Sequence, residues 1–222
     1  MENVFSIAID GPAGAGKSTV AKMVAARMGA KYLDTGATYR TMGLYMKRLG
    51  LTSAEEIAAA AGKPRVEVVL DDSGQRMLLD GEDVTAQLSG ETAGGLASLV
   101  AKVPAVRERM VALQRAIAKS RSIVMDGRDI GTVVLPDAPL KVFLTASAEE
   151  RARRRHGDMP DTPYETILAD IRRRDYEDAH REISPMRQAD DAVLLDCTNM
   201  TKDEVADEIT RMARERMKGG NV

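Results

Sequence analysis

The chain has 222 residues, a formal net charge of −2 at pH 7 and a hydrophobic content of 44%. A chain of this length can bury a real core, and it predicts one main domain with a small insertion. The near-neutral charge argues against bulk affinity for nucleic-acid polymers, and no apolar run is long enough to span a bilayer.

Cysteine usage and the N-terminus bear on the compartment. The one cysteine, Cys197, excludes an intrachain disulfide framework and fits a reducing compartment. It follows a predicted strand, so we expect it to be a small core hydrophobe. No basic segment followed by an apolar one opens the sequence, so no signal peptide is predicted. We therefore expect a cytoplasmic location.

The N-terminal stretch 4–19 reads VFSIAIDGPAGAGKST. An apolar run of β-formers, 4–9, leads directly into the pattern G-x-x-x-x-G-K-S. An alanine-rich helical pattern follows over about 17–28. A strand, a glycine loop and a helix in this order are the context that identifies a P-loop rather than a plain glycine turn.

The residue types of this loop suit a polyphosphate. Its glycines let backbone N–H groups curl around phosphates, and the helix N-terminus adds positive potential. Lys17 can reach the β- and γ-phosphates, and the hydroxyl of Ser18 can ligate Mg²⁺. The motif thus predicts nucleoside triphosphate binding by Gly11, Pro12, Ala13, Gly14, Ala15, Gly16, Lys17, Ser18 and Thr19.

The elements after the P-loop helix continue an alternating pattern. A short strand is predicted at 31–33, and Asp34 or Thr35 is a plausible N-cap for a helix over 37–49. Asp34 could alternatively lie near the Mg²⁺ shell, and we favour the cap. The next helix, 53–61, has glutamates in its first turn and a glycine after its end.

The pattern changes at residue 64. Strands are predicted at 65–70 and 75–79, separated by the turn cluster DDSG, and a short third strand at 82–85. A small antiparallel meander inside an otherwise alternating chain is predicted to be an insertion.

The rest of the chain returns to alternating helices and strands. Helices are predicted over 92–103, 104–119, 148–156, 164–180 and 201–217, and strands over 122–126, 140–144 and 192–195. Five short strands separated by helices predict an α/β fold of the P-loop three-layer sandwich type. We expect a five-stranded parallel sheet with helices on both faces and a small antiparallel β insertion.

Charged clusters follow several of these strands, where doubly wound sheets bind ligands. They are DTGATYR at 34–40, DGRD at 126–129, RARRR at 151–155, and one helix face with Arg174, Asp178 and Arg181. A lone arginine is usually a solvated surface charge. Arginines recurring around a P-loop instead indicate a second anionic ligand, because the guanidinium fork donates two parallel bonds to phosphate. The set predicts phosphoryl transfer between two substrates.

Four segments make the chain resemble the bacterial cytidylate kinases, a family of nucleoside monophosphate kinases. They are IDGPAGAGKST (9–19), LDTGATYR (33–40), DGRDIGTVVLPDA (126–138) and RRRD…HREISP (172–185). The resemblance covers essentially the whole chain, and its DGRD-IGTVV block is far more specific than the P-loop. Thr35 stands where the family commonly has Ser, which keeps a hydroxyl. The loop 157–163 looks short for a lid.

The resemblance implies a single P-loop kinase domain over 1–222. Within it we expect a monophosphate-binding insertion at about 36–103, with the three-stranded piece at about 64–85, and a lid at about 148–165. ATP would be the donor, Mg²⁺ the metal, and CMP and dCMP the acceptors, in a monomeric enzyme of pyrimidine metabolism. The alternatives are a kinase of another small acceptor, such as UMP, AMP or shikimate, and a non-catalytic P-loop nucleotide-sensing module.

The resemblance also implies a role for each matching residue. The phosphate and ribose region of CMP would be held by Thr35, Arg40, Arg128, Arg174 and Arg181. Asp178 would bind the sugar hydroxyls. The cytosine ring would face Ser98, Arg107 and Asp129, although Ser98 is about equally well read as a small residue in a packed helix. The lid arginines that close over ATP would be Arg151 and Arg155. The catalytic residues would be Lys17, Arg128, Arg155 and Arg174, and the metal ligand Ser18.

One alternative on the long helix concerns Arg174 and Asp178. Their spacing of four residues also suits an exposed ion pair, which would contribute only about 0.3–0.5 kcal/mol. That pair would stabilise the helix slightly and leave catalysis untouched.

Overall fold

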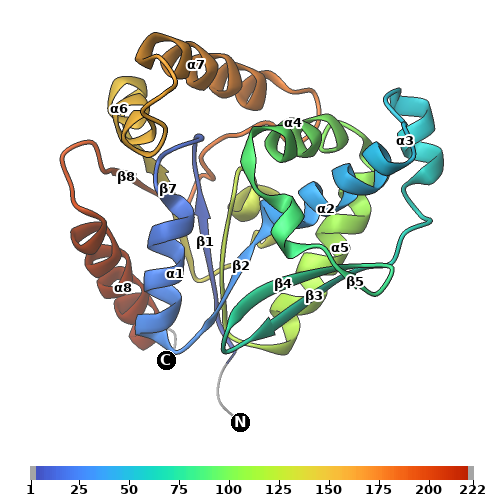
Figure 1. Ribbon diagram of the computed structural model, residues 1–222. Coiled ribbons are helices and arrows are strands. Elements are labelled where there is room, and N and C mark those ends of the chain that lie inside the picture. The colour runs from blue at the N-terminus through green and yellow to red at the C-terminus, as the bar shows by residue number, and fades with distance from the viewer. Residues whose placement is uncertain (1–3, 220–222) are drawn as a thin grey trace. The chain divides into compact units, whose positions relative to one another are not determined.

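The structure, a computed structural model, describes residues 4–219. The chain divides into two compact units (Figure 1). The first, which we call the P-loop unit, contains the chain up to Lys31 and the chain from Arg121 onward. The second, the inserted unit, is Tyr32–Ser120.

A parallel sheet of five strands in the order β2-β6-β1-β7-β8 confirms the predicted α/β fold. The strands are β1 (Ser6–Asp10), β2 (Lys31–Asp34), β6 (Ile123–Gly127), β7 (Leu140–Thr145) and β8 (Val193–Asp196). In the parallel register, Ile7 of β1 pairs with Val124 of β6 and with Leu140 of β7. The central strands read as near-continuous apolar runs because neighbouring helices and strands cover them, and Ile7, Ala8 and Ile9 are fully buried.

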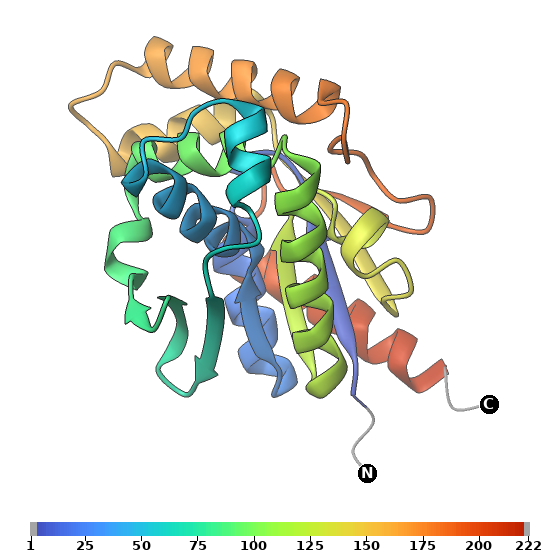
Figure 2. The ribbon, with the colours of Figure 1, turned by 90° about the vertical axis from the view of Figure 1, so that its right-hand side faces the viewer.

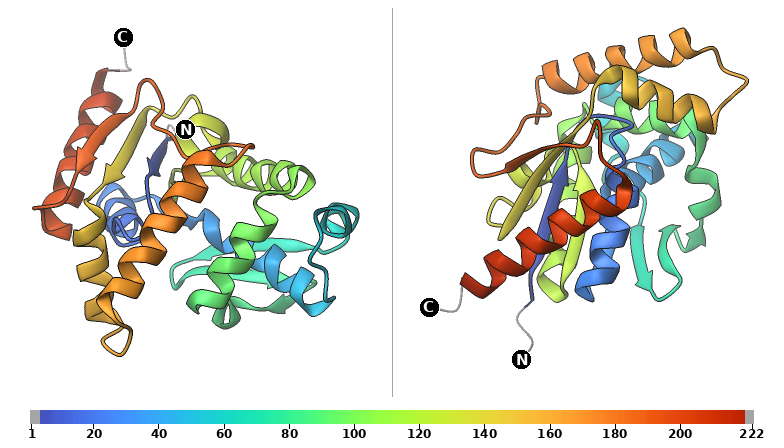
Figure 3. Two further views of the ribbon diagram at one scale, coloured as in Figure 1. Left: turned by 90° about the horizontal axis from the view of Figure 1, so that it is seen from above. Right: turned by 90° about the vertical axis from the view of Figure 1, so that its left-hand side faces the viewer.

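The P-loop unit contains the α-helices α1 (Lys17–Met28), α6 (Ala148–Asp158), α7 (Tyr164–His180) and α8 (Lys202–Gly219). Helices α1 and α8 pack side by side along the sheet (Figures 1 and 3). Helices α6 and α7 form a hairpin with its own apolar cluster of Ala152, Ile167, Leu168 and Ile171 (Figure 3). Within residues 4–219 no helix combines the length and hydropathy that a membrane span needs.

The inserted unit contains helices and a small sheet (Figure 2). Its elements are α2 (Thr35–Arg48), α3 (Ala54–Ala60), β3 (Val66–Asp71), β4 (Gly74–Leu79), β5 (Glu82–Asp83), the 3₁₀ turn η1 (Thr85–Leu88), α4 (Gly90–Val100) and α5 (Pro104–Ser120). The antiparallel order β3-β4-β5 confirms the predicted meander. Strand β5 ends earlier than predicted, because Thr85 starts η1 and its hydroxyl donates to Asp83 Oδ1 at 2.6 Å.

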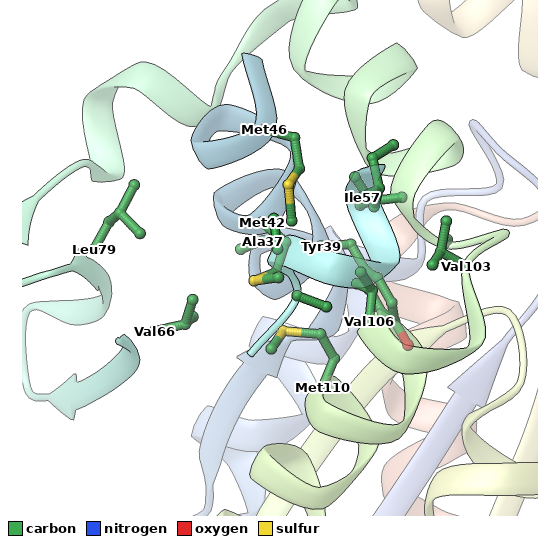
Figure 4. Packing of buried hydrophobic residues seen from close by; sticks show 14 of the residues in the cluster. Ala37, Tyr39, Met42, Met46, Ile57, Val66, Leu79, Val103, Val106 and Met110 are labelled. Atoms are coloured by element: carbon green, nitrogen blue, oxygen red, sulfur yellow. The ribbon is translucent and has the colours of Figure 1, made fainter. Parts of the chain in front are cut away.

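Apolar side chains from α2, α3, α5 and the small sheet form the core of the inserted unit (Figure 4). Met42, Ile57 and Met110 are among its fully buried members. Methionines fill irregular gaps between elements that cross at different angles, which suits a core shared by helices and a short hairpin. The unit therefore has a hydrophobic core of its own.

Local signals fixed several helix starts. The Asp34 side chain accepts a hydrogen bond from Ala37 N at 3.0 Å, so Asp34 is the N-cap and α2 begins at Thr35. Ser53 and Glu56 form a reciprocal capping box on α3. The sequence did not indicate a π-helical turn, η2, over Ile130–Val134 directly after DGRD.

Close packing of α2 on α4 depends on a glycine. A Cβ added to Gly43 would lie 2.7 Å from the Cβ of Leu96 and 2.9 Å from its carbonyl carbon. The two helix backbones can therefore approach only because position 43 has no side chain.

We expect Gly43→Ala to reduce the free energy of unfolding by about 1–3 kcal/mol, because backbone atoms must shift to admit the methyl group. Gly95→Ala on α4 is the matched control, since its added Cβ meets nothing within 4 Å. That control should be neutral or stabilising by up to about 1 kcal/mol, the usual gain of Ala over Gly in a helix. Urea unfolding of both variants measures the difference, and equal effects would contradict the close approach.

Candidate functional site

The P-loop runs from β1 into α1 and is shaped by two glycines. Gly11 has φ +143°, and a Cβ there would lie 2.0 Å from the carbonyl oxygen of Leu144, so no side chain fits. Gly16, with φ +87°, is the N-cap residue of α1 and turns the chain into the helix. The loop thus brings the N-terminus of α1 to the carboxyl end of the sheet, as the motif predicts.

The side chain of Lys17 folds back against the backbone of the P-loop. It is 6% exposed, and its Nζ donates to the carbonyl oxygen of Pro12 at 2.7 Å. Burial, assisted by the nearby guanidinium of Arg128, lowers the pKa of Lys17 to about 7, while Asp126 and Asp10 act in the opposite direction. The ammonium is therefore a poorly solvated cation, and the approach of polyphosphate charge would favour its protonated form.

The hydroxyl of Ser18 donates to Oδ2 of Asp126 at 2.8 Å. Asp126 lies near the end of β6 and is 6% exposed. A hydroxyl and a carboxylate side by side are hard oxygen donors of the kind that Mg²⁺ prefers. Asp126 was not among the residues predicted for the site, although it is the first residue of the DGRD cluster.

The two remaining charged residues of DGRD pair with α7 and the segment that follows it. Arg128 Nε contacts Asp178 Oδ2 at 2.7 Å. Arg181 Nη2 lies 3.6 Å from Asp129 Oδ1, with both side chains about nine-tenths buried. Arg181 Nε also donates to the carbonyl oxygen of Ser184. The structure thus brings together four of the residues predicted for the acceptor nucleotide.

Arg174, a fifth predicted residue, pairs with Asp170 at 2.9 Å one turn earlier on α7. Asp178 is instead engaged by Arg128, so the structure does not support an Arg174–Asp178 pair. The helix face of Asp178 is thereby tied to the loop after β6.

Arg151 is buried at the base of the α6–α7 hairpin. Its guanidinium pairs with Asp175 of α7, with the shorter contact at 2.6 Å, and Nη1 donates to Ala13 O at 2.9 Å. A predicted lid arginine therefore braces the P-loop backbone in this structure. Arg155 lies further along α6 and is half-buried.

A cavity of about 650 Å³ opens beside the exposed side of the P-loop. Its lining comes from Gly14 to Val20, from α6 and from the segment between β8 and α8, including Arg153, Cys197, Met200 and Thr201. Arg154 also lines the cavity. Its guanidinium contacts Glu150 at 2.7 Å and donates to the carbonyl oxygen of Cys197 at 2.9 Å. Hydrogen bonds from Arg153 first, with Arg154 adding to them, lower the pKa of Glu150 to about 2. Cys197 itself is buried, as predicted.

Asp10, the last residue of β1, holds the turn after DGRD. Its two carboxylate oxygens accept the backbone N–H groups of Ile130 and Gly131, each at 2.7 Å. These two donors open η2, so Asp10 fixes the backbone directly after Asp129. Burial raises the pKa of Asp10 to about 6, against the lowering effect of the two N–H bonds. The sequence signal for this role of Asp10 is its position as an acidic residue at the end of an apolar strand.

In the inserted unit the predicted residues lie on α2, α4 and α5. Thr35 is buried, and its carbonyl accepts from Thr38 Oγ1, which in turn accepts from Gln114 at 2.9 Å. Arg107 lies over the ring of Tyr39, 5.5 Å from its centroid. Arg40 pairs with Asp34 at 2.6 Å.

Ser98 is exposed on α4. The structure thus surrounds Thr35 and Arg107 with fixed partners and places Ser98 on the surface of its helix.

A model of the family described as Cytidylate kinase matches residues 7–215. A cytidylate kinase from Mycolicibacterium paratuberculosis is 49% identical over 224 residues, covering 97% of this chain and 98% of that protein. One from Bacillus subtilis is 43% identical over 222 residues, covering 97% and 99%.

Among solved structures, a gluconokinase from Sinorhizobium meliloti superposes with a TM-score of 0.51 at 17% identity. The match covers 96% of this chain and 94% of that one. At this identity the likeness supports the fold alone.

The raised pKa of Asp10 predicts a pH-dependent stability. The folded state holds a proton between about pH 6 and pH 4 that the unfolded state releases, because the pKa rises from 3.8 to about 6. The cost of burying the charge is therefore present above pH 6 and is relieved as the pH falls through 6. Relative to Asp10→Asn, wild-type stability should rise by about 1 kcal/mol from pH 7 to pH 5.

Urea unfolding at both pH values measures this difference. The control is Asp190→Asn, which alters an exposed carboxyl and should show no comparable trend. A wild-type advantage over Asp10→Asn that is the same at both pH values would contradict the assignment.

Proposed function

The chain belongs to the cytidylate kinase family, and we propose that it catalyses ATP-dependent phosphoryl transfer to CMP and dCMP, giving CDP and dCDP. One observation carries the proposal most directly. The P-loop, with Lys17 and the Ser18–Asp126 contact, shares a compact unit with the arginine–carboxylate set of DGRD and α7. Phosphoryl transfer requires this combination of a triphosphate cradle and charge-neutralising cations.

The P-loop unit would bind the donor. Backbone N–H groups of the loop and the N-terminus of α1 suit the triphosphate, and the cavity beside Gly14 to Val20 is large enough for the nucleoside. Ser18 and Asp126 would hold Mg²⁺, whose charge would neutralise part of the phosphate charge. Arg151 would support the P-loop through Ala13, and Arg155 would reach the donor from α6.

The remaining site residues would serve the acceptor, as the family resemblance implies. Arg128, Arg174 and Arg181 would engage its phosphate, and Asp178 its sugar hydroxyls. In the inserted unit, Thr35 and Arg40 would engage the phosphate region, and Ser98 and Arg107 the base. Asp129 would accept a hydrogen bond from the exocyclic amine of cytosine, a donor that uracil lacks.

The chemistry needs no covalent intermediate with the protein. An oxygen of the acceptor phosphate forms the new bond to the γ-phosphorus, and the bond from that phosphorus to the bridging oxygen of ADP breaks. Lys17 and the arginines would stabilise the spread of negative charge in this transition state, because they are already fixed by their partners. Exclusion of water would prevent wasteful hydrolysis of ATP.

We further propose a single kinase domain, in which the inserted unit serves the monophosphate and the α6–α7 region, about 148–165, acts as the lid. The single buried cysteine supports a cytoplasmic location. We propose a monomer, as the family resemblance implies.

The test is ADP production from ATP with a panel of monophosphates. We expect CMP and dCMP to exceed UMP by about ten- to a hundredfold in kcat/KM, since one base contact contributes roughly 1–3 kcal/mol. Asp129→Asn should narrow this gap. As a control, Lys17→Ala should lower turnover at least about a hundredfold with every acceptor. ADP production that does not depend on an acceptor would instead indicate a nucleotide-sensing module.

A second experiment distinguishes effects on acceptor binding from effects on donor binding. Asp178→Ala and Arg181→Ala should raise KM for CMP, or lower kcat, about tenfold or more, with a much smaller change in KM for ATP. Arg181→Ala should be the more damaging, since a phosphate contact also counts in the transition state. The control is Arg173→Ala on α7, whose exposed side chain pairs with Asp170 and Glu177 of that helix. Wild-type kinetics in both test variants would remove this helix face from the mechanism.

A further inference from the structure

Gln75 joins the small sheet of the inserted unit to the start of α2. It lies in β4 on the same side of the strand as Met77 and Leu79, which are both buried. Its side chain is half-buried and hydrogen-bonds the backbone of Asp34. Oε1 accepts the backbone N–H of Asp34 at 2.7 Å, and Nε2 donates to the carbonyl oxygen of the same residue at 3.1 Å.

One amide side chain thus satisfies both backbone groups of a single residue. A two-point contact of this kind fixes the position of Asp34 along the chain and the direction in which its side chain leaves the backbone. A carboxylate at position 75 could not reproduce the contact, because it has no donor for the Asp34 carbonyl oxygen. A methionine could fill the space but would make neither bond.

Each carboxylate oxygen of Asp34 has its own partner. Oδ1 caps α2 through Ala37 N at 3.0 Å, and Oδ2 contacts Arg40 Nη2 at 2.6 Å. Gly36 leaves room for this arrangement, because a Cβ there would lie 3.0 Å from Arg40 Nη1 and 3.1 Å from Asp34 Oδ1. Displacing the Asp34 backbone would therefore move both the helix cap and the guanidinium.

Few other contacts fix that guanidinium. Arg40 Nε is buried and has no hydrogen-bond acceptor among residues 4–219. Its orientation therefore depends on the contact with Asp34, and the orientation of Asp34 depends on Gln75. Two contacts in series, Gln75 with Asp34 and Asp34 with Arg40, connect the small sheet to Arg40.

We propose that Gln75 is a positioning residue, which holds Asp34 so that its carboxylate orients Arg40 for the phosphate of the acceptor nucleotide. This inference rests on the proposed function, because it assigns Arg40 to the acceptor. The three-stranded sheet would then influence the affinity for the acceptor nucleotide through Gln75. It would leave the affinity for the donor nucleotide unchanged.

The experiment compares Gln75→Met and Gln75→Glu with the matched control Arg76→Gln. Arg76 is the next residue of β4, is exposed, and contacts Asp71 and Asp83 within the sheet. Both Gln75 variants should raise KM for CMP about tenfold and change KM for ATP less than about twofold. Arg76→Gln should change neither constant, even if it lowers the melting temperature.

A double-mutant cycle with Arg40→Ala tests whether Gln75 acts through Arg40. If it does, adding Gln75→Met to Arg40→Ala should raise KM for CMP no further, because the residue being positioned is already absent. Additive effects, or a Gln75→Met variant with lower stability and unchanged KM for CMP, would reduce Gln75 to a packing role. Should Gln75→Met fail to fold, the same cycle is run with Gln75→Glu.

The two proposals fail in different ways. A wild-type protein that does not phosphorylate CMP, or an Arg40→Ala variant with unchanged KM for CMP, would refute the acceptor role on which the inference rests. An Arg40→Ala variant with raised KM beside a Gln75→Met variant with normal KM would refute the inference alone.

Discussion

Guanidinium–carboxylate pairing organises the charged residues of this protein. Arg128 is held by Asp178, Arg151 by Asp175, Arg181 by Asp129 and Arg40 by Asp34. An unpartnered arginine would have to give up substantial side-chain freedom on binding phosphate, and clustered arginines would repel one another. Carboxylate partners remove both problems before a substrate arrives. The sequence supplies the partners for such pairing, with 34 Asp and Glu residues against 32 Lys and Arg.

Pairing also sets a limit on phosphate affinity, because each carboxylate competes for the fork that the phosphate would use. Arg128 meets Asp178 through Nε, and Arg40 meets Asp34 through Nη2, so each retains further N–H groups for another acceptor. Arg151 differs, since it donates to Asp175 in bidentate fashion and also to Ala13 and Ala146. That difference supports a bracing role for Arg151 and binding roles for Arg128 and Arg40.

Helices and strands were predictable from the sequence wherever a local pattern of residues determines them. The P-loop helix and the helix Tyr164–His180 begin and end at the predicted residues, and Asp34 is the cap that its position suggested. The contacts that support the site were not predictable in this way. Asp10 with Gly131, and Asp175 with Arg151, join residues far apart in the chain, and no spacing rule connects them. Gln75 carries no signal at all, because a glutamine in a short strand is normally a solvated residue.

The placement of Arg151 constrains how the α6–α7 hairpin can move. Arg151 is 5% exposed, so separating it from Asp175 would leave a buried charge unpaired, at a cost of about 3–5 kcal/mol. The apolar cluster between the helices adds to that cost. A closing motion that preserves both the Arg151–Asp175 ion pair and this apolar cluster must carry α6 and α7 together as one body. Since Arg151 also donates to Ala13, and Arg154 donates to the carbonyl oxygen of Cys197, a motion that preserves these contacts as well would pivot close to the P-loop. The arginine that braces the P-loop thereby also couples α6 to α7.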